Sequence, residues 1–122
     1  MRHIVSLDSV KAFYLDRKEI IEHLKKISYS ALHEFPEIHQ IRLIGSLANH
    51  TATGLSDVDL WIIVNEYKVE HPIERLKPYY FYFADKIFLS LDIIITLKDD
   101  LYKEIHNKIL QESILLAEQS KI

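Results

Sequence analysis

The residues of this chain best suited to chemistry are acidic and lie at the start of an apolar segment. Asp57 and Asp59 are two positions apart at the entry to the β-branched segment 58–64. Because side chains alternate faces along a strand, both carboxylates are predicted to project from one side. Such a pair repels unless a divalent cation lies between the two groups, and oxygen ligands of this kind suit Mg²⁺ or Mn²⁺. The alternative is that Asp57 caps a loop while Asp59 faces water.

A third carboxylate, Asp92, lies inside the strongly apolar segment 87–96, which is predicted to be a strand. An ionised carboxylate in a strand interior is costly unless it is paired or bound to a metal. If this strand lies beside segment 58–64, three carboxylates converge. Pairing with a lysine or arginine, or a place at a sheet edge, explains Asp92 taken alone. The presence of Asp57 and Asp59 favours the metal interpretation.

Both glycines of the chain, Gly45 and Gly54, fall within one ten-residue stretch just before the acidic pair. A glycine lets the backbone bend sharply or approach a ligand closely. After a strand and before a helix, the N–H groups that follow Gly45 and the Ser46 hydroxyl could bind phosphate oxygens. A tight turn with Ser46 as a helix N-cap explains the same residues, and both interpretations can hold together.

Alternating helix and strand patterns must position these residues. In the first predicted helix, apolar residues recur at steps of three and four. The predicted order is a helix over 9–33, a strand over Ile38–Ile44, a short helix over 46–49, a strand over 58–64, a helix from Pro72 to Asp85, a strand over 87–96 and a last helix from Asp99 or Asp100 to Gln119. This order predicts an α/β or α+β fold with a small mixed sheet flanked by helices.

Composition narrows the class of protein. The 122 residues, 48% of them hydrophobic, suit a single domain over 1–122. A net charge of −3 gives no case for nucleic-acid binding, and the absence of cysteine excludes a disulfide scaffold. The longest apolar run is too short to span a membrane and no signal peptide is evident, so we expect a soluble cytoplasmic protein without a membrane partner.

The combined motif resembles the signature of the DNA polymerase beta-type nucleotidyltransferase superfamily. The resemblance rests on Gly45-Ser46-x-Ala48, on the ten residues between Ser46 and Asp57-x-Asp59, on Ser56 just before the pair, and on Leu-Asp92-Ile. Within that superfamily the chain is similar to the minimal nucleotidyltransferases that are usually partnered with a HEPN-type helical protein. The similarity runs from about Ile38 to the end, and the segment Ile109–Leu116 resembles the last helix of that group.

The resemblance implies a role for each motif residue. Gly45 and Ser46 would hold the β- and γ-phosphates of a nucleoside triphosphate, and Ser56 would belong to the same binding set. Asp57 and Asp59 would bind two Mg²⁺ ions. Asp92 would bind one of these ions and align or deprotonate the attacking hydroxyl. Two ions can stabilise both the entering and the leaving oxygen of an in-line displacement.

The chain departs from the family pattern at two positions. Many members carry Arg and Gly where Asn49 and His50 stand. The loss of the Arg removes a phosphate or loop contact. His50 could substitute as a donor, or it is a polar loop residue. Trp61, predicted on the face of the acidic pair, would be a core aromatic or the border of a nucleotide base. The aromatic run Tyr79–Phe83 covers the whole circumference of a helix, so part of it must point outward and offer a protein interface.

These features predict an enzyme that uses Mg²⁺ and ATP to move AMP onto an acceptor. No residues remain for a second, acceptor-binding domain, so the acceptor surface would come from another protein. The resemblance implies a hydroxyl, such as a tyrosine, on a HEPN toxin, with this chain as the antitoxin of a hetero-oligomer. One rival is a binding module that neutralises its partner by contact. A second rival, transfer to a small molecule or nucleic acid, is disfavoured by acidity and size.

Overall fold

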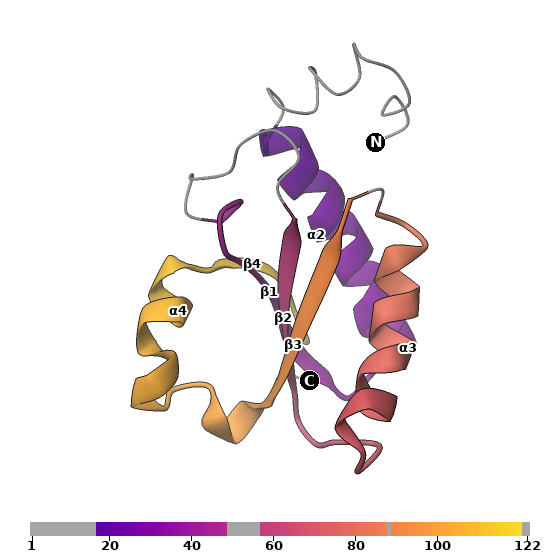
Figure 1. The fold of residues 1–122 in the computed structure, drawn as a ribbon, viewed down its shortest axis with the longest axis vertical. Helices are drawn as coiled ribbons and strands as arrows, with labels where there is room; N and C mark the ends of the chain where they lie inside the picture. The colour runs from indigo at the N-terminus through magenta and orange to yellow at the C-terminus, as the bar shows by residue number, and fades with distance from the viewer. Residues whose placement is uncertain (1–16, 49–56, 88, 121–122) are drawn as a thin grey trace.

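The computed structural model describes residues 17–48, 57–87 and 89–120 (Figure 1). Their elements are α2 (Arg17–Glu34), β1 (Ile38–Ile44), β2 (Val58–Val64), α3 (Pro72–Ala84), β3 (Leu91–Leu97), the 3-10 turns η1 (Lys98–Asp100) and η2 (Glu104–His106), α4 (Asn107–Glu112) and β4 (Ile114–Glu118). The four strands form one mixed sheet. This arrangement confirms the predicted α+β class. No described helix is both long and apolar enough to cross a bilayer.

The strands lie in the order β3-β2-β1-β4. Strand β1 is antiparallel to β2 and β4, whereas β2 and β3 are parallel. The register places Ile44 opposite Asp59, and Asp59 opposite Asp92. The end of β1 and the starts of β2 and β3 therefore meet at one end of the sheet.

The two faces of the sheet are covered differently, with α2 and α3 on one side and α4 on the other (Figure 1). The larger core lies under α2 and α3, where Leu60 and Ile62 of β2 pack with Leu24 and Phe83. The opposite face carries a smaller cluster of Trp61, Ile63 and Leu101. Trp61 is 2% exposed and donates an Nε1–H hydrogen bond to Thr96 Oγ1 at 2.9 Å, so it is a core residue.

The two long helices follow from their sequence patterns. In α2, Ile20, Leu24, Ile27 and Ala31 are all buried, as their spacing predicts. The predicted start at 9 lies outside the described residues. Helix α3 has Pro72 in its first turn and His71 as N-cap, whose side chain accepts a hydrogen bond from the Ile73 N–H. It ends at Ala84, one residue before the predicted Asp85.

The prediction of a last helix from Asp99 or Asp100 to Gln119 is wrong. The chain forms η1, η2 and the short α4, then leaves the helical conformation at Ser113 and continues as β4. The segment Ile109–Leu116 is therefore half helix and half strand. Strand β4 pairs with the outer side of β1 and buries Leu116 and Ala117. Pairing satisfies the backbone groups of β1 on that side, a tertiary gain that local periodicity does not reveal.

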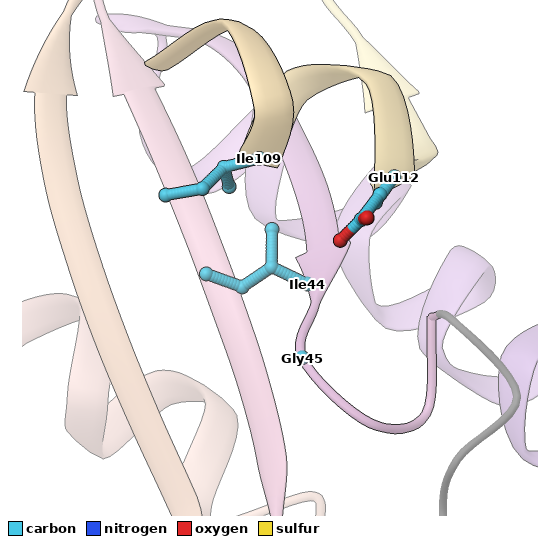
Figure 2. Close-up of a pocket in the computed structure, with 4 residues that line it drawn as sticks. All are labelled: Ile44, Gly45, Ile109 and Glu112. Carbon is cyan, nitrogen blue, oxygen red and sulfur yellow. The ribbon is translucent and has the colours of Figure 1, made fainter. Parts of the chain in front are cut away.

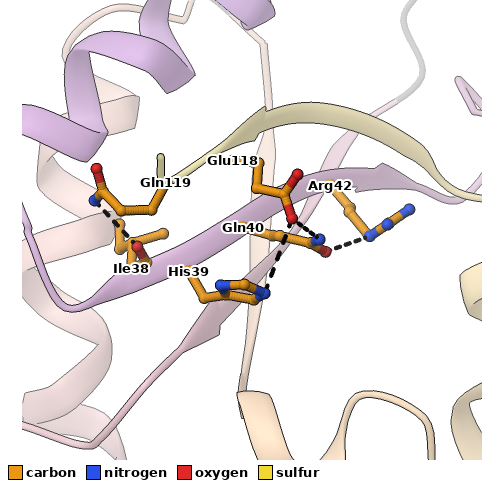
Figure 3. A network of polar contacts seen from close by, with 6 residues as sticks. All are labelled: Ile38, His39, Gln40, Arg42, Glu118 and Gln119. Atoms are coloured by element: carbon orange, nitrogen blue, oxygen red, sulfur yellow. Dashed lines mark hydrogen bonds and ion pairs between the residues drawn. The ribbon is translucent and has the colours of Figure 1, made fainter. Parts of the chain in front are cut away.

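Polar side chains reinforce the β1–β4 pairing (Figure 3). Gln40 Nε2 donates to Glu118 Oε2 at 2.8 Å, and Arg42 Nε donates to Gln40 Oε1 at 2.9 Å. Beyond the end of β4, Gln119 Nε2 donates to the Ile38 carbonyl at 3.3 Å. The bonds from Gln40 to Glu118 and from Gln119 to Ile38 cross between β1 and the end of the chain, and they help to hold a strand that has only five residues.

Two further boundaries differ from prediction. The strand expected over 87–96 begins at Leu91, where pairing with Val58 starts, and ends at Leu97. The short helix expected over 46–49 is a turn through Ala48, closed by a hydrogen bond from the Ala48 N–H to the Gly45 carbonyl at 3.1 Å. Asn49 lies outside the described residues.

Candidate active site

The strand register brings the predicted acidic residues to one end of the sheet. Asp57 immediately precedes β2, Asp59 is its second residue, and Asp92 is the second residue of β3. Asp59 and Asp92 stand opposite each other in the parallel pair, so their side chains share a face. Asp57 and Asp92 are exposed, whereas Asp59 is partly buried.

Three carboxylates, those of Asp57, Asp59 and Asp92, crowd negative charge at this end of the sheet. Burial, the charges of Asp92 and Asp57, and a hydrogen bond with the Asp92 side chain all raise the pKa of Asp59. Each of these causes disfavours the ionised form of Asp59, and a proton or a cation would relieve it. The three groups offer only oxygen ligands, which is the donor type that Mg²⁺ prefers.

The three aspartate side chains lie near one another but do not form a complete set of metal ligands. Across residues 17–48, 57–87 and 89–120, no three His, Asp or Glu side chains are already arranged to hold a metal ion. The residues fit a divalent cation by charge and donor type, and they would have to adjust their side chains to bind one. An open acidic cluster is compatible with an ion that also needs oxygens from a substrate phosphate.

The turn after β1 contacts this cluster directly. Gly45 has φ +78°, a conformation that favours glycine, and a Cβ at this position would overlap Asp59 Oδ2. The turn therefore favours glycine, and any larger residue would also have to displace the Asp59 carboxylate. Ser46, partly exposed, follows within the turn. Ser56, Asn49 and His50, which sequence analysis also singled out, lie outside the described residues.

Arg17 supports the turn and was not found by sequence analysis. From the first turn of α2, its Nε donates to the Leu47 carbonyl at 2.7 Å and its Nη2 donates to the Ala48 carbonyl at 3.1 Å. These bonds tie the turn to α2. A single arginine about 30 residues away from its partners has no sequence pattern that would have revealed this contact.

The aromatic run is divided as its helical spacing predicts. Tyr79 and Phe83 are buried, while Tyr80 and Phe81 are 39% and 64% exposed. The Tyr79 hydroxyl donates to Glu37 Oε2, and burial together with this bond raises the pKa of Tyr79. The exposed pair and Ile73, which is 60% exposed, place three apolar side chains on the outer side of α3, near the exposed ion pair of Lys77 and Glu74.

A comparison with protein-family models identifies the family of this chain. The family model described as polymerase beta, nucleotidyltransferase, matches residues 18–122. The chain belongs to this family. The match spans the turn at Gly45, the acidic cluster and strand β4 of the nucleotidyltransferase domain.

Solved structures show the same fold. A Sulfolobus solfataricus protein assigned to the nucleotidyltransferases superimposes with a TM-score of 0.62 at 16% identity, covering 86% of each chain. A toxin–antitoxin structure with AMP-PNP superimposes with a TM-score of 0.51 at 14% identity, covering 79% of this chain and 74% of that chain. A comparison with curated protein sequences gives no match.

Proposed function

We propose that this nucleotidyltransferase moves AMP from ATP to a hydroxyl of a partner protein. The observation that carries the proposal is the meeting of Gly45, Asp59 and Asp92 at one end of the sheet in a family member. A glycine turn suits phosphate oxygens, and a pair of facing carboxylates suits the cation that accompanies phosphates.

Each residue has a role in this proposal. The N–H groups after Gly45 and the Ser46 hydroxyl hold the β- and γ-phosphates, and Ser56 assists them. Asp57, Asp59 and Asp92 would hold two Mg²⁺ ions, which when bound stabilise the charge that develops on the entering and leaving oxygens. Asp92, at the exposed side of the cluster, aligns the acceptor hydroxyl and takes its proton.

The transfer balances without a further reactant. The acceptor oxygen forms a bond to the α-phosphorus of ATP, and the bond from this phosphorus to the bridging oxygen of the β-phosphate breaks. Pyrophosphate leaves with the electron pair of that bond. The acceptor proton passes to the Asp92 carboxylate and then to water. The product is a phosphodiester between AMP and the acceptor.

The acceptor that we propose is a tyrosine of a HEPN-type helical toxin, which AMP would silence. Support comes from the likeness of this fold to a toxin–antitoxin structure and from the exposed apolar residues of α3, Ile73, Tyr80 and Phe81, which offer contacts for a protein partner. The chain would then act as an antitoxin in a hetero-oligomer with its target.

A second candidate is a binding module that neutralises its partner by contact alone. The observation that favours it is the absence of a ready-made metal cage among residues 17–48, 57–87 and 89–120. Asn49 and His50, at positions where the resemblance to the family implies Arg and Gly, point the same way. The cost of keeping three acids together without a cation argues against it.

One experiment separates the two candidates. The chain is co-purified with the HEPN-type helical protein proposed as its acceptor, incubated with ATP and Mg²⁺, and the intact mass of that partner is measured. Transfer predicts a mass gain of one or more AMP groups that is lost in Asp57→Ala and in Asp92→Asn. A stable complex whose partner gains no mass would instead establish the binding module.

A further inference from the structure

A cavity of about 280 Å³ lies between the end of β1 and α4. Ile44, Gly45, Ile109 and Glu112 line it (Figure 2). The cavity lies on the same face of the sheet as Asp59, because Ile44, which lines it, stands opposite Asp59 in the antiparallel pair. The cavity therefore begins at the same glycine that forms the proposed phosphate-binding turn.

The shape and lining of the cavity suit one part of a nucleotide. Ile44 comes from the sheet and Ile109 from α4, so two apolar side chains line the cavity from different elements (Figure 2). Pockets that hold a whole small-molecule ligand usually have volumes of about 300–1,000 Å³. This smaller cavity would hold a nucleoside while the phosphates remain at the turn.

Glu112 supplies the polar group that such a pocket needs. Its side chain projects toward the end of β1 (Figure 2), and no described residue forms a hydrogen bond or ion pair with it. A carboxylate only accepts hydrogen bonds. Nucleosides offer it two kinds of donor, the exocyclic amino group of adenine or cytosine and the ribose hydroxyls.

The backbone that carries Glu112 is held in place. The next residue, Ser113, donates its hydroxyl to the Leu110 carbonyl at 2.7 Å and accepts a hydrogen bond from Arg42 Nη1 at 2.9 Å. Arg42 lies on β1, two residues before Ile44, so one side chain fixes the end of α4 relative to the cavity wall. A carboxylate on an anchored backbone at the rim of an apolar pocket can select a ligand that offers it a hydrogen-bond donor.

We infer that this cavity is the nucleoside subsite of the enzyme and that Glu112 is a specificity-determining residue that accepts a hydrogen bond from the bound nucleoside. The inference rests on the proposed function, because it assigns the remainder of the triphosphate that the turn would hold. It predicts that binding of the nucleoside and binding of the phosphates can be weakened separately.

Equilibrium binding to the full chain in Mg²⁺ tests the inference. The probes are inorganic tripolyphosphate, α,β-methylene ATP, and two forms of that analogue, one without the 6-amino group and one without the ribose hydroxyls. The variants are Glu112→Ala and Ile109→Trp, which fills the cavity from an exposed position. Glu104→Ala, which removes an exposed carboxylate outside the cavity lining, is the matched control.

We expect Glu112→Ala and Ile109→Trp to weaken α,β-methylene ATP by about tenfold or more, and to leave tripolyphosphate unchanged. The wild type should bind the form that lacks the true donor more weakly than it binds the full analogue, whereas Glu112→Ala should bind the two equally. This comparison identifies the donor as the amino group or a ribose hydroxyl. Unchanged binding of the analogue in both variants would overturn the subsite while leaving the proposed function intact. A wild-type chain that binds neither probe would overturn both.

Discussion

The backbone of Gly45 lies directly against the carboxylate of Asp59. A Cβ at Gly45 would overlap Asp59 Oδ2 and lie 3.2 Å from its Cγ. The register of β1 and β2 imposes this contact, since Ile44 stands opposite Asp59. The proposed phosphate-binding turn and the proposed metal-binding strand therefore pack against each other. A substitution at Gly45 or Asp59 should change the position of the other residue.

Gly45→Ala is expected to lower the free energy of unfolding by about 2–4 kcal/mol, because it combines a left-handed backbone with an overlap. Urea unfolding measures this loss. In Gly45→Ala with Asp59→Gly, the overlap is removed and only the backbone term remains. If the effect of Gly45→Ala is the same in both backgrounds, the contact with Asp59 carries no energy.

Asp59→Asn is expected to stabilise the metal-free protein at neutral pH. Because the folded protein raises the pKa of Asp59, the stability linked to its protonated form is present at acid pH and is lost as the pH rises. Thermal unfolding in EDTA between pH 4 and 8 should show a difference between wild type and variant that grows with pH. Asp99→Asn, which removes an exposed carboxylate outside the cluster, is the control for the loss of a negative charge alone.

The same pair of proteins tests whether the acidic cluster binds a cation. Mg²⁺ that neutralises the cluster should raise the midpoint of thermal unfolding of the wild type. The variant lacks the charge of Asp59, so its midpoint should rise less. Equal rises in the two proteins would mean that Mg²⁺ acts elsewhere on the chain.

The elements that hold the site were largely predictable from sequence. Strands β1 and β2 and helix α3 follow from periodicity and from Pro72, and the motif spacing located Gly45 and the acidic residues. Strand β4 was not predictable, since its apolar residues 114–117 continue the helical pattern of 107–112. The segment becomes a strand because it pairs with the side of β1 that β2 leaves open, and this tertiary contact cannot be read from the local sequence.

Arg17 shows the same limit for the site itself. Its two hydrogen bonds to the Leu47 and Ala48 carbonyls connect a helix start to the Gly45 turn, and only tertiary structure brings them together. Arg17→Met is expected to lower the free energy of unfolding by about 1–3 kcal/mol through these bonds. It should also weaken binding of tripolyphosphate in Mg²⁺, because the turn loses its anchor.

Arg17→Lys and Lys18→Met are the controls for this effect. The lysine keeps the charge but cannot reach both carbonyls with a planar fork, so it should recover only part of the loss. Lys18, the exposed neighbour, forms no hydrogen bond to the Leu47 or Ala48 carbonyl in the described part of the chain, so its replacement should change little. Full recovery by Arg17→Lys would mean that charge, rather than the paired hydrogen bonds, holds the turn.

Ser113→Ala tests the link from β1 to the end of α4. The substitution removes the donor to the Leu110 carbonyl and leaves Arg42 Nη1 without its acceptor, at an expected cost of about 1–2 kcal/mol in urea unfolding. Burial already lowers the pKa of Arg42, so this guanidinium depends on its remaining hydrogen bonds. Since Glu112 adjoins Ser113, affinity for α,β-methylene ATP should fall while affinity for tripolyphosphate holds. A fall in both affinities would show that the substitution disturbs the sheet end as a whole rather than the position of Glu112.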